Sequence, residues 1–324
     1  MIRLLVQQTF GCCSALYQKR PINNRKSGTN LKTYDSRPWL KFYDEGVDPD
    51  FISPNATCVD LLEKSFSDFA EHAALQFMGT TLTYRQLDRY SCQFSTFLVE
   101  IGCAPGDVVG LNMPNIPQYL IALAGTLRAG CIVSGVSPLL APKEMIHQLN
   151  DLDARVLVTL DGIYEGKVLK IKDKVPGLGH VVVTNAADII SPSGSAIPAP
   201  IRGKTIHTFG EILDRYPAES PERTVKPDDI CFIQYTGGTT GLPKGAELTQ
   251  NSFATNLLQF GQWHDLDRGN EIILSGFPLF HVGGLIFGMV GLSMGGSQIL
   301  IPDPRNISHI CDEFTLYKPT LMAN

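Results

Sequence analysis

One stretch of the chain, residues 235–245, concentrates residue types that can bind an anion, and it reads YTGGTTGLPKG. The glycines before its lysine are Gly237, Gly238 and Gly241, and the threonines are Thr236, Thr239 and Thr240. Glycine adopts positive φ easily and has no Cβ, so the backbone N–H groups of such a loop can converge on a bulky anion. Threonine hydroxyls add hydrogen-bond donors, and Lys244 adds a mobile positive charge. The stretch therefore predicts a loop that binds a polyphosphate.

The spacing within this loop differs from that of the common P-loop. That motif, G-x-x-x-x-G-K-[ST], has a hydroxyl residue directly after its lysine to hold magnesium. Here Pro243 precedes Lys244 and Gly245 follows it. A glycine-rich turn between two strands is the alternative interpretation, and for a short glycine pattern taken alone it is the more common one.

A second candidate is His281, which lies within the uncharged run GFPLFHVGG. A single histidine among apolar residues is most often a buried core residue, so the residue type alone does not identify a site. Its apolar neighbours also have two interpretations. Phe277, Phe280 and residues 282–285 can line a channel for an apolar substrate or pack in the core.

Two helices with clear start signals precede both candidates. Thr57 can cap the first helix, and Thr83 with Gln86 forms a capping box for the second, which stops at Gly102. In both helices apolar residues recur at steps of three and four, which is typical of a helix with one face in the core. They are Val59, Leu62, Phe66, Phe69, Leu87, Tyr90, Phe94, Phe97 and Ile101.

From residue 108 onwards, short apolar runs alternate with helical patterns. The predicted strands lie at residues 108–111, 131–136, 156–159 and 181–183. The predicted helices lie at residues 116–129, 142–150 and 209–216, and residues 186–203 predict a surface loop. Strands that alternate with helices over short connections pair in parallel. We therefore expect an α/β fold with doubly wound, mostly parallel sheets in two packed subdomains.

Three regions are expected along the chain. Residues 1–34 are an N-terminal extension, residues 35–229 form a first α/β region, and residues 230–324 carry the glycine-rich loop and begin a second. The extension has six basic residues and no acidic one, which is the charge pattern of a mitochondrial presequence. It lacks a clear amphipathic helix with arginines, so a disordered tail or a misplaced start codon is favoured, and the fold is expected to begin after it.

The composition excludes some classes of function. With 324 residues, 44% of them hydrophobic, the chain can bury a large core, and its formal net charge of −5 argues against nucleic-acid binding. Small molecules or other proteins are the expected partners. The eight cysteines include no C-x-x-C pair and no His/Cys cluster at metal-ligand spacing, which favours buried free thiols in a reducing compartment.

Residues 272–302 contain no charged side chain, which raises the question of a transmembrane span. The run is interrupted by Pro278, His281 and several glycines, and it lacks flanking basic clusters. A buried loop, helix and strand of an α/β core is the favoured interpretation. A cytoplasmic location is therefore expected, with peripheral attachment to the inner face of a membrane or a mitochondrial location as alternatives.

The eleven residues YTGGTTGLPKG closely resemble the phosphate loop of the adenylate-forming superfamily, which contains acyl-CoA synthetases, luciferases and the adenylation domains of peptide synthetases. The resemblance extends from Trp39 to the last residue through LTYRQLDRYS, GDVVGLNMPNIPQY, RAGCIVSGVSPLLAPKEMIHQLND and GFPLFHVGG. FIQYTGGTTG and IPDPRNI are most similar to bacterial long-chain fatty acid CoA ligases. The resemblance implies an enzyme that uses ATP and Mg²⁺ to convert a fatty acid into acyl-AMP, and then coenzyme A to form acyl-CoA.

The resemblance also implies roles for individual residues. Thr236 would bind Mg²⁺ and a phosphate oxygen, and the loop from Gly237 to Gly241, with its threonine hydroxyls, would hold the β and γ phosphates. Lys244 would follow the departing pyrophosphate. His281 would border the site of the acyl carboxylate.

Some features depart from the family pattern. Gln250 stands where relatives commonly have histidine, and Gly237 stands where many have serine or threonine. The sequence has no counterpart of the family's magnesium glutamate, ribose aspartate, hinge arginine or adenylation lysine. We therefore expect an N-terminal portion of such a ligase that is inactive alone. A non-catalytic nucleotide- or acyl-binding paralogue and a ligase for an aryl or shorter acid are the alternatives.

Overall fold

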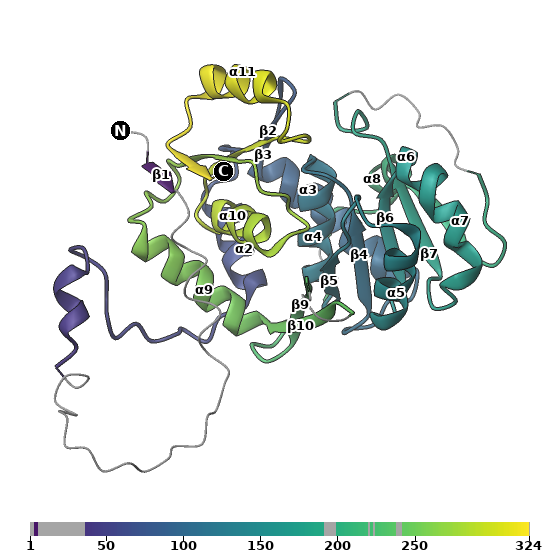
Figure 1. Cartoon of the computed structure of the whole chain (residues 1–324), viewed down its shortest axis with the longest axis horizontal. Helices are drawn as coiled ribbons and strands as arrows, with labels where there is room; N and C mark the ends of the chain where they lie inside the picture. The colour runs from purple at the N-terminus through teal and green to yellow at the C-terminus, as the bar shows by residue number, and fades with distance from the viewer. Residues whose placement is uncertain are drawn as a thin grey trace, which may run out of the picture.

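The computed structural model describes residues 3–5, 36–190, 199–219, 221–222, 224–237 and 242–323. Within these residues the strands form two sheets, one of six strands and one of seven (Figure 1). Most neighbouring strands in both sheets are parallel. The expected α/β fold with mostly parallel sheets is confirmed.

The six-stranded sheet, called sheet A below, has the order β1-β13-β11-β12-β2-β3. Its strands are β1 (Arg3–Leu5), β2 (Ala73–Phe77), β3 (Thr80–Thr83), β11 (Ile272–Ser275), β12 (Ser297–Leu300) and β13 (Leu321–Ala323). Only the β2–β3 pair in this described sheet is antiparallel. β1 is formed by three residues of the N-terminal extension, and it pairs with β13.

The seven-stranded sheet, called sheet B, has the order β10-β9-β5-β4-β6-β7-β8. Its strands are β4 (Val108–Asn112), β5 (Ile132–Gly135), β6 (Val156–Leu160), β7 (His180–Thr184), β8 (Thr205–Thr208), β9 (Ile230–Thr236) and β10 (Lys244–Thr249). β9 and β10 are antiparallel, whereas the other neighbours are parallel. Both sheets draw strands from both sides of Asp229, so the region boundary that the sequence suggested there does not separate one sheet from the other.

Helices pack on both faces of sheet B, as a doubly wound arrangement requires. The described helices are η2 (Pro38–Phe42), α2 (Cys58–Asp68), α3 (Tyr84–Glu100), α4 (Pro117–Arg128), α5 (Pro142–Asp151), α6 (Asp161–Ile163), η3 (Tyr164–Val168), α7 (Leu169–Ile171), η4 (Lys172–Lys174), α8 (Phe209–Arg215), α9 (Gln250–Trp263), α10 (Val282–Ser293) and α11 (Ile307–Tyr317). α2, α3, α4 and α10 share one core with strands of both sheets. α5, η3 and α7 cover the opposite face of sheet B, and α11 packs on the far side of sheet A.

The strands of sheet B alternate their side chains between these two cores. In β4, Val109 and Leu111 belong to the core between the sheets, whereas Val108 belongs to the outer core. In β6, Val158 belongs to the core between the sheets and Leu157 belongs to the outer core. Strands that are buried on both faces read as continuous apolar runs, which is why the sequence pattern located them.

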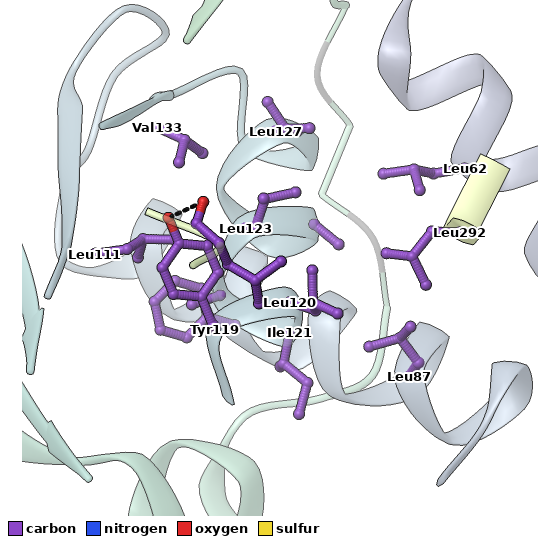
Figure 2. Close-up of a cluster of buried hydrophobic side chains, with 14 of the residues drawn as sticks. Leu62, Leu87, Leu111, Tyr119, Leu120, Ile121, Leu123, Leu127, Val133 and Leu292 are labelled. Carbon is purple, nitrogen blue, oxygen red and sulfur yellow. Dashed lines mark hydrogen bonds between the residues drawn. The ribbon is translucent and has the colours of Figure 1, made fainter. Parts of the chain in front are cut away.

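α4 lies in the middle of the molecule, and all twelve of its residues are buried. Figure 2 shows Tyr119, Leu120, Leu123 and Leu127 of this helix among side chains from other elements of the shared core. The buried Arg128 at its end donates to Glu63 and Asp88 at 2.8 and 2.5 Å, so its charge is paired. This central helix therefore packs against sheet B on one side and against helices α2 and α3 of the shared core on the other.

The predicted helix starts are confirmed. Thr57 and Thr83 each accept a hydrogen bond from the third backbone N–H of their helix, and both capping boxes are complete. α3 ends before Gly102, whose φ of +83° is left-handed and therefore suits glycine.

The uncharged run of residues 272–302 forms β11, α10 and β12, as the sequence favoured. No helix in the described part of the chain is long and apolar enough to cross a membrane.

Six cysteines are described, all of them free thiols, and five of these are buried. Burial raises the pKa of the Cys92 thiol to about 11, which keeps it protonated at neutral pH.

Candidate functional site

The β9–β10 hairpin places two of the predicted site residues opposite one another. Its register pairs Thr236 with Lys244 at the open end of the antiparallel ladder, directly where the glycine-rich loop leaves the sheet. Residues that are directly opposite in an antiparallel pair point to the same face, so the hydroxyl and the ammonium share one side of the hairpin. Both residues are exposed, and Thr236 Oγ1 lies 3.4 Å from the carbonyl of Lys244.

This hairpin satisfies both interpretations of the loop. It is a turn between two strands, and it also presents a hydroxyl and a cation at its base. Gly238, Thr239, Thr240 and Gly241 lie outside the described residues, so their predicted contacts with phosphates stay predictions. Gly237 is described, and it does not adopt the positive φ that we expected of the loop glycines.

Gly245 has a packing role that sequence reasoning missed. A Cβ at this position would lie 2.7 Å from Cγ2 of Ile233 and 3.4 Å from the ring of Tyr235 across the ladder. A contact below 3.0 Å forces a neighbour to move, so the two strands pair closely only with glycine here. The signal in the sequence was a glycine directly after the loop lysine, at the start of a strand.

His281 is an exposed residue at the start of α10 and not a member of the core. It is the N-cap of this helix, and its Nδ1 accepts a hydrogen bond from the backbone N–H of Gly283 at 3.3 Å. The core interpretation of this histidine is therefore wrong. Its proposed place beside an acyl carboxylate stays a prediction.

The apolar neighbours of His281 are divided between the core and partly exposed positions. Leu285 is 1% exposed and belongs to the core between the sheets, which supports core packing for this residue. Phe277 is partly buried, and its ring centroid lies 6.1 Å from that of Phe287. Phe280 is partly buried against the shared core. A role of the two phenylalanines in an acyl channel stays a prediction.

The segment before His281 rests on the strand next to the loop-bearing strand. The backbone of Phe280 packs against Gly135, the last residue of β5. β5 is the neighbour of β9, with Val133 paired to Phe232, so Gly135 lies beside Gln234 near the carboxyl end of β9. The carboxyl ends of parallel strands are where α/β sheets bind ligands. The fold therefore brings the histidine segment and the glycine-rich loop to the same edge of sheet B.

Gln234 is a further polar residue at this edge that sequence reasoning missed. Its side chain is buried, and its Nε2 has no hydrogen-bond partner in the part of the chain that the structure describes. A buried unsatisfied donor is costly, so it usually meets a water or a ligand. Gln234 follows Phe232 by two residues, so its side chain points to the same face of β9 as that of Phe232, which lies in the core shared by the two sheets.

Gln250 has a structural role at the start of α9. Its Oε1 accepts the backbone N–H of Cys58 at 2.9 Å, and its carbonyl accepts a hydrogen bond from the Cys58 thiol. The glutamine is 1% exposed and joins the first residue of α9 to the first residue of α2. The hydrogen bonding left open by the sequence is thus satisfied within the fold.

The described residues contain no group of three or more His, Cys, Asp or Glu side chains that could hold a metal ion. Thr236 is the residue of this edge that the sequence assigned to magnesium. Mg²⁺ at nucleotide sites is bound through one or two protein ligands together with waters and phosphate oxygens. A single exposed hydroxyl at the base of the loop fits that kind of site.

Known proteins resemble this chain in sequence and in fold. The profile of the AMP-binding enzyme family matches residues 62–324. A long-chain-fatty-acid–CoA ligase of Escherichia coli O6:H1 is 33% identical over 303 residues, which cover 88% of this chain and 54% of that protein. The chain thus spans about half the length of this relative.

Two solved structures have the same fold. The crystal structure of an anthranilate CoA ligase in complex with anthranoyl-AMP superposes with a TM-score of 0.71 and 26% identity, and the match covers 84% of this chain and 50% of that one. A long-chain-fatty-acid–CoA ligase from Archaeoglobus fulgidus gives a TM-score of 0.72 at 21% identity, over 86% of this chain and 53% of that one.

Proposed function

Because this chain belongs to the AMP-binding enzyme family, we propose that it binds the ATP phosphates and the acyl group in an acid–thiol ligase reaction, with a long-chain fatty acid as the acid. The observation that carries the proposal is the pairing of Thr236 with Lys244 at the mouth of the glycine-rich loop. The similarity to long-chain-fatty-acid–CoA ligases supports the choice of acid.

The chemistry follows from the poor reactivity of a carboxylate towards a thiol. In the first step a carboxylate oxygen attacks the α-phosphorus of ATP, the bond to pyrophosphate breaks, and acyl-AMP forms. In the second step the sulfur of coenzyme A attacks the acyl carbon, and AMP leaves with the electrons of the C–O bond. Positioning and neutralisation of the phosphate charge are the main contributions that a protein can make to the first step.

Lys244 and Thr236 are proposed to act on the phosphates. The exposed ammonium of Lys244 neutralises charge on the triphosphate and follows the pyrophosphate as it leaves. Thr236 donates its hydroxyl to a phosphate oxygen or offers it as a ligand to Mg²⁺, which would supply further charge neutralisation. The loop from Gly237 to Gly241 is proposed to donate its N–H groups and threonine hydroxyls to the β and γ phosphates.

His281 is proposed to border the acyl carboxylate, with Phe277 and Phe280 beside the first carbons of the acyl chain. The exposure of His281 and the position of its segment at the carboxyl edge of sheet B support this proposal. We propose no residue of this chain for adenine, ribose or coenzyme A.

ATP–pyrophosphate exchange measured with a series of acids tests the function. Exchange that depends on palmitate and increases with acyl length is the expected result. Binding of MgATP without any exchange would favour the non-catalytic paralogue.

An aryl acid is the second candidate substrate, and the fold match to an anthranilate CoA ligase favours it. Exchange that is faster with anthranilate than with palmitate would decide for this alternative. The small-molecule partners in either case are the acid, ATP and coenzyme A.

Since long-chain fatty acids partition into bilayers, we also propose peripheral membrane attachment of an otherwise cytoplasmic protein, which sedimentation with lipid vesicles can test.

A further inference from the structure

The segment between β11 and α10, residues 277–280, holds His281 at the edge of sheet B, and we call it the histidine segment. It has no regular structure, yet its backbone contacts three other elements. The N–H of His281 closes a turn on the carbonyl of Pro278 at 3.0 Å, and His281 then caps α10. The position of the imidazole therefore depends on what holds the four residues before it.

Asn115 uses both ends of its amide to hold the histidine segment. It lies in the connection between β4 and α4 and is 4% exposed. Its Nδ2 donates to the carbonyl of Phe277 at 3.0 Å, and its Oδ1 accepts the N–H of Leu279 at 2.8 Å. An amide side chain offers a donor and an acceptor on two separate atoms, whereas a carboxylate cannot donate and an apolar side chain can do neither.

Two further residues hold the segment from the same side. The hydroxyl of the fully buried Tyr119 donates to the carbonyl of Leu279 at 3.1 Å, and this hydrogen bond is the dashed line in Figure 2. Gly135 lies against the backbone of Phe280, where an added Cβ would lie 2.8 Å from the Phe280 Cα. The carbonyl of Gly135 is itself held by Gln148 Nε2 at 2.9 Å, so β5 cannot retreat from a larger side chain.

These three contacts join the histidine segment to sheet B, in addition to the hydrogen bond from the Phe277 N–H to Ser275 of its own sheet. β11 and α10 belong to sheet A and its covering helix, whereas Asn115, Tyr119 and Gly135 come from β4, α4 and β5 or their connections. β5 is the direct neighbour of β9, which begins the glycine-rich loop. The three residues thus fix His281 relative to Thr236 and Lys244.

We propose that Asn115 is a positioning residue for His281, and that its two hydrogen bonds to the histidine segment align the acyl-carboxylate side of the site with the phosphate side. This inference rests on the proposed function. Loss of Asn115 should weaken the binding of a ligand that reaches the acyl-carboxylate side of the site and leave unchanged the binding of a ligand that contacts only the glycine-rich loop.

The test measures two affinities of this chain by calorimetry. One ligand is palmitoyl-sulfamoyl-adenosine, a stable mimic of acyl-AMP, and the other is inorganic tripolyphosphate with Mg²⁺. For Asn115→Ala we expect an affinity for the acyl-adenylate mimic that is lower by about tenfold, which is the loss of roughly one or two buried hydrogen bonds. The affinity for tripolyphosphate should stay within about twofold.

The matched control is Gln93→Ala. Gln93 is also 4% exposed and also donates its amide to backbone carbonyls of another segment, those of Leu213 and Tyr216. It joins α3 to the end of α8, away from the histidine segment. Both affinities of this variant should equal those of the wild type if it remains folded by circular dichroism.

The outcomes separate the inference from the proposed function. If the wild type binds neither ligand, the proposed function fails and the inference fails with it. If the wild type binds both and Asn115→Ala loses both equally, or loses neither, the inference alone is overturned. If Asn115→Ala does not fold, Tyr119→Phe decides, because it removes only one hydroxyl and should show the same selective loss at a smaller size.

Discussion

The hydroxyl of Tyr235 donates to Oδ2 of Asp151 at 2.5 Å, which joins the residue before Thr236 to the last residue of α5. Burial raises the pKa of Tyr235, and the hydrogen bond to Asp151 raises it further. The phenol therefore stays protonated and remains a donor throughout the physiological range. The base of the glycine-rich loop is thus fixed to the helix layer outside sheet B.

Tyr235→Phe should lower both stability and phosphate binding. The variant loses a hydrogen bond to a carboxylate that is exposed, so we expect a loss of about 1 kcal/mol in the free energy of unfolding. Urea denaturation measures this loss, and calorimetry with tripolyphosphate measures the effect on the loop. Asp151→Asn keeps an acceptor and should lose less. Equal stability of all three proteins would show that the hydrogen bond does not hold β9.

Lys244→Ala should weaken phosphate binding much more than acid binding, because the ammonium acts on the anionic end of the nucleotide. We expect the affinity for tripolyphosphate to fall about tenfold or more, and the dependence on salt to become weaker. Lys143→Ala, which removes an exposed lysine of α5, is the control and should change neither affinity. An equal decrease for palmitate and for tripolyphosphate would contradict the assigned role.

Gly245→Ala and Gly237→Ala form a matched pair at the two ends of the loop. At Gly245 the new methyl would overlap with Ile233, and overpacking of this kind costs about 1–3 kcal/mol. At Gly237 no described atom lies within 4 Å of the added Cβ and φ is not left-handed, so the change in stability should stay within about 0.5 kcal/mol. Thermal melts compare the two variants, and a reversed order would refute the packing role of Gly245.

Two histidines on neighbouring strands at the other end of sheet B should make stability depend on pH. Nδ1 of His180 lies 3.2 Å from Nε2 of His207. Burial and, after it, the neighbouring His180 and Arg215 lower the pKa of His207 to about 4, while Glu211 opposes the shift. Burial, and then Arg155, lowers the pKa of His180.

The unfolded chain therefore binds more protons than the folded chain between pH values of about 6.5 and about 4. The contribution of the two histidines to the free energy of unfolding should be fully present above about pH 6.5. It should decrease as the pH falls through this window and stay constant below it. Urea midpoints across this range measure the effect. His207→Gln should reduce the decrease, whereas His309→Gln on α11 should retain it. If the urea midpoint of His207→Gln decreased with pH as much as that of the wild type, groups other than these histidines would cause the effect.

The sequence predicted the elements whose local signals agree with their place in the fold. The capping boxes at Thr57 and Thr83 located α2 and α3, and apolar runs located the strands of sheet B because these are buried on both faces. These signals depend on residues that are close in the chain.

The β2–β3 hairpin was missed because its turn has an unusual sequence. Met78 and Gly79 both have positive φ, at 47° and 79°, as a two-residue hairpin turn requires. Asparagine or glycine commonly occupies the first of these positions, and methionine gives no such signal. β10 was expected only as the second strand of the turn interpretation and without bounds, because an exposed edge strand shows no apolar alternation and four of its residues are exposed.

The contacts of the candidate site could not be predicted for a different reason. Asn115 and Phe277 are 162 residues apart, and Gly135 meets Phe280 only because two sheets pack through a shared helix layer. A sequence identifies residue types that can do chemistry, but the alignment of two segments from different sheets depends on the tertiary packing. The roles of Gln234 and Gly245 also depend on the tertiary packing, so the sequence did not predict them.

The position of β10 at the end of sheet B has a consequence for the solubility of the protein. Among the described strands β10 pairs only with β9, so its other edge presents open N–H and C=O groups to the solvent. Charged side chains on such an edge discourage edge-to-edge aggregation, and β10 carries Lys244 and Glu247, both exposed. The lysine that we assign to the nucleotide thus also discourages edge-to-edge pairing, and its replacement by an apolar residue would promote aggregation even where no nucleotide is bound.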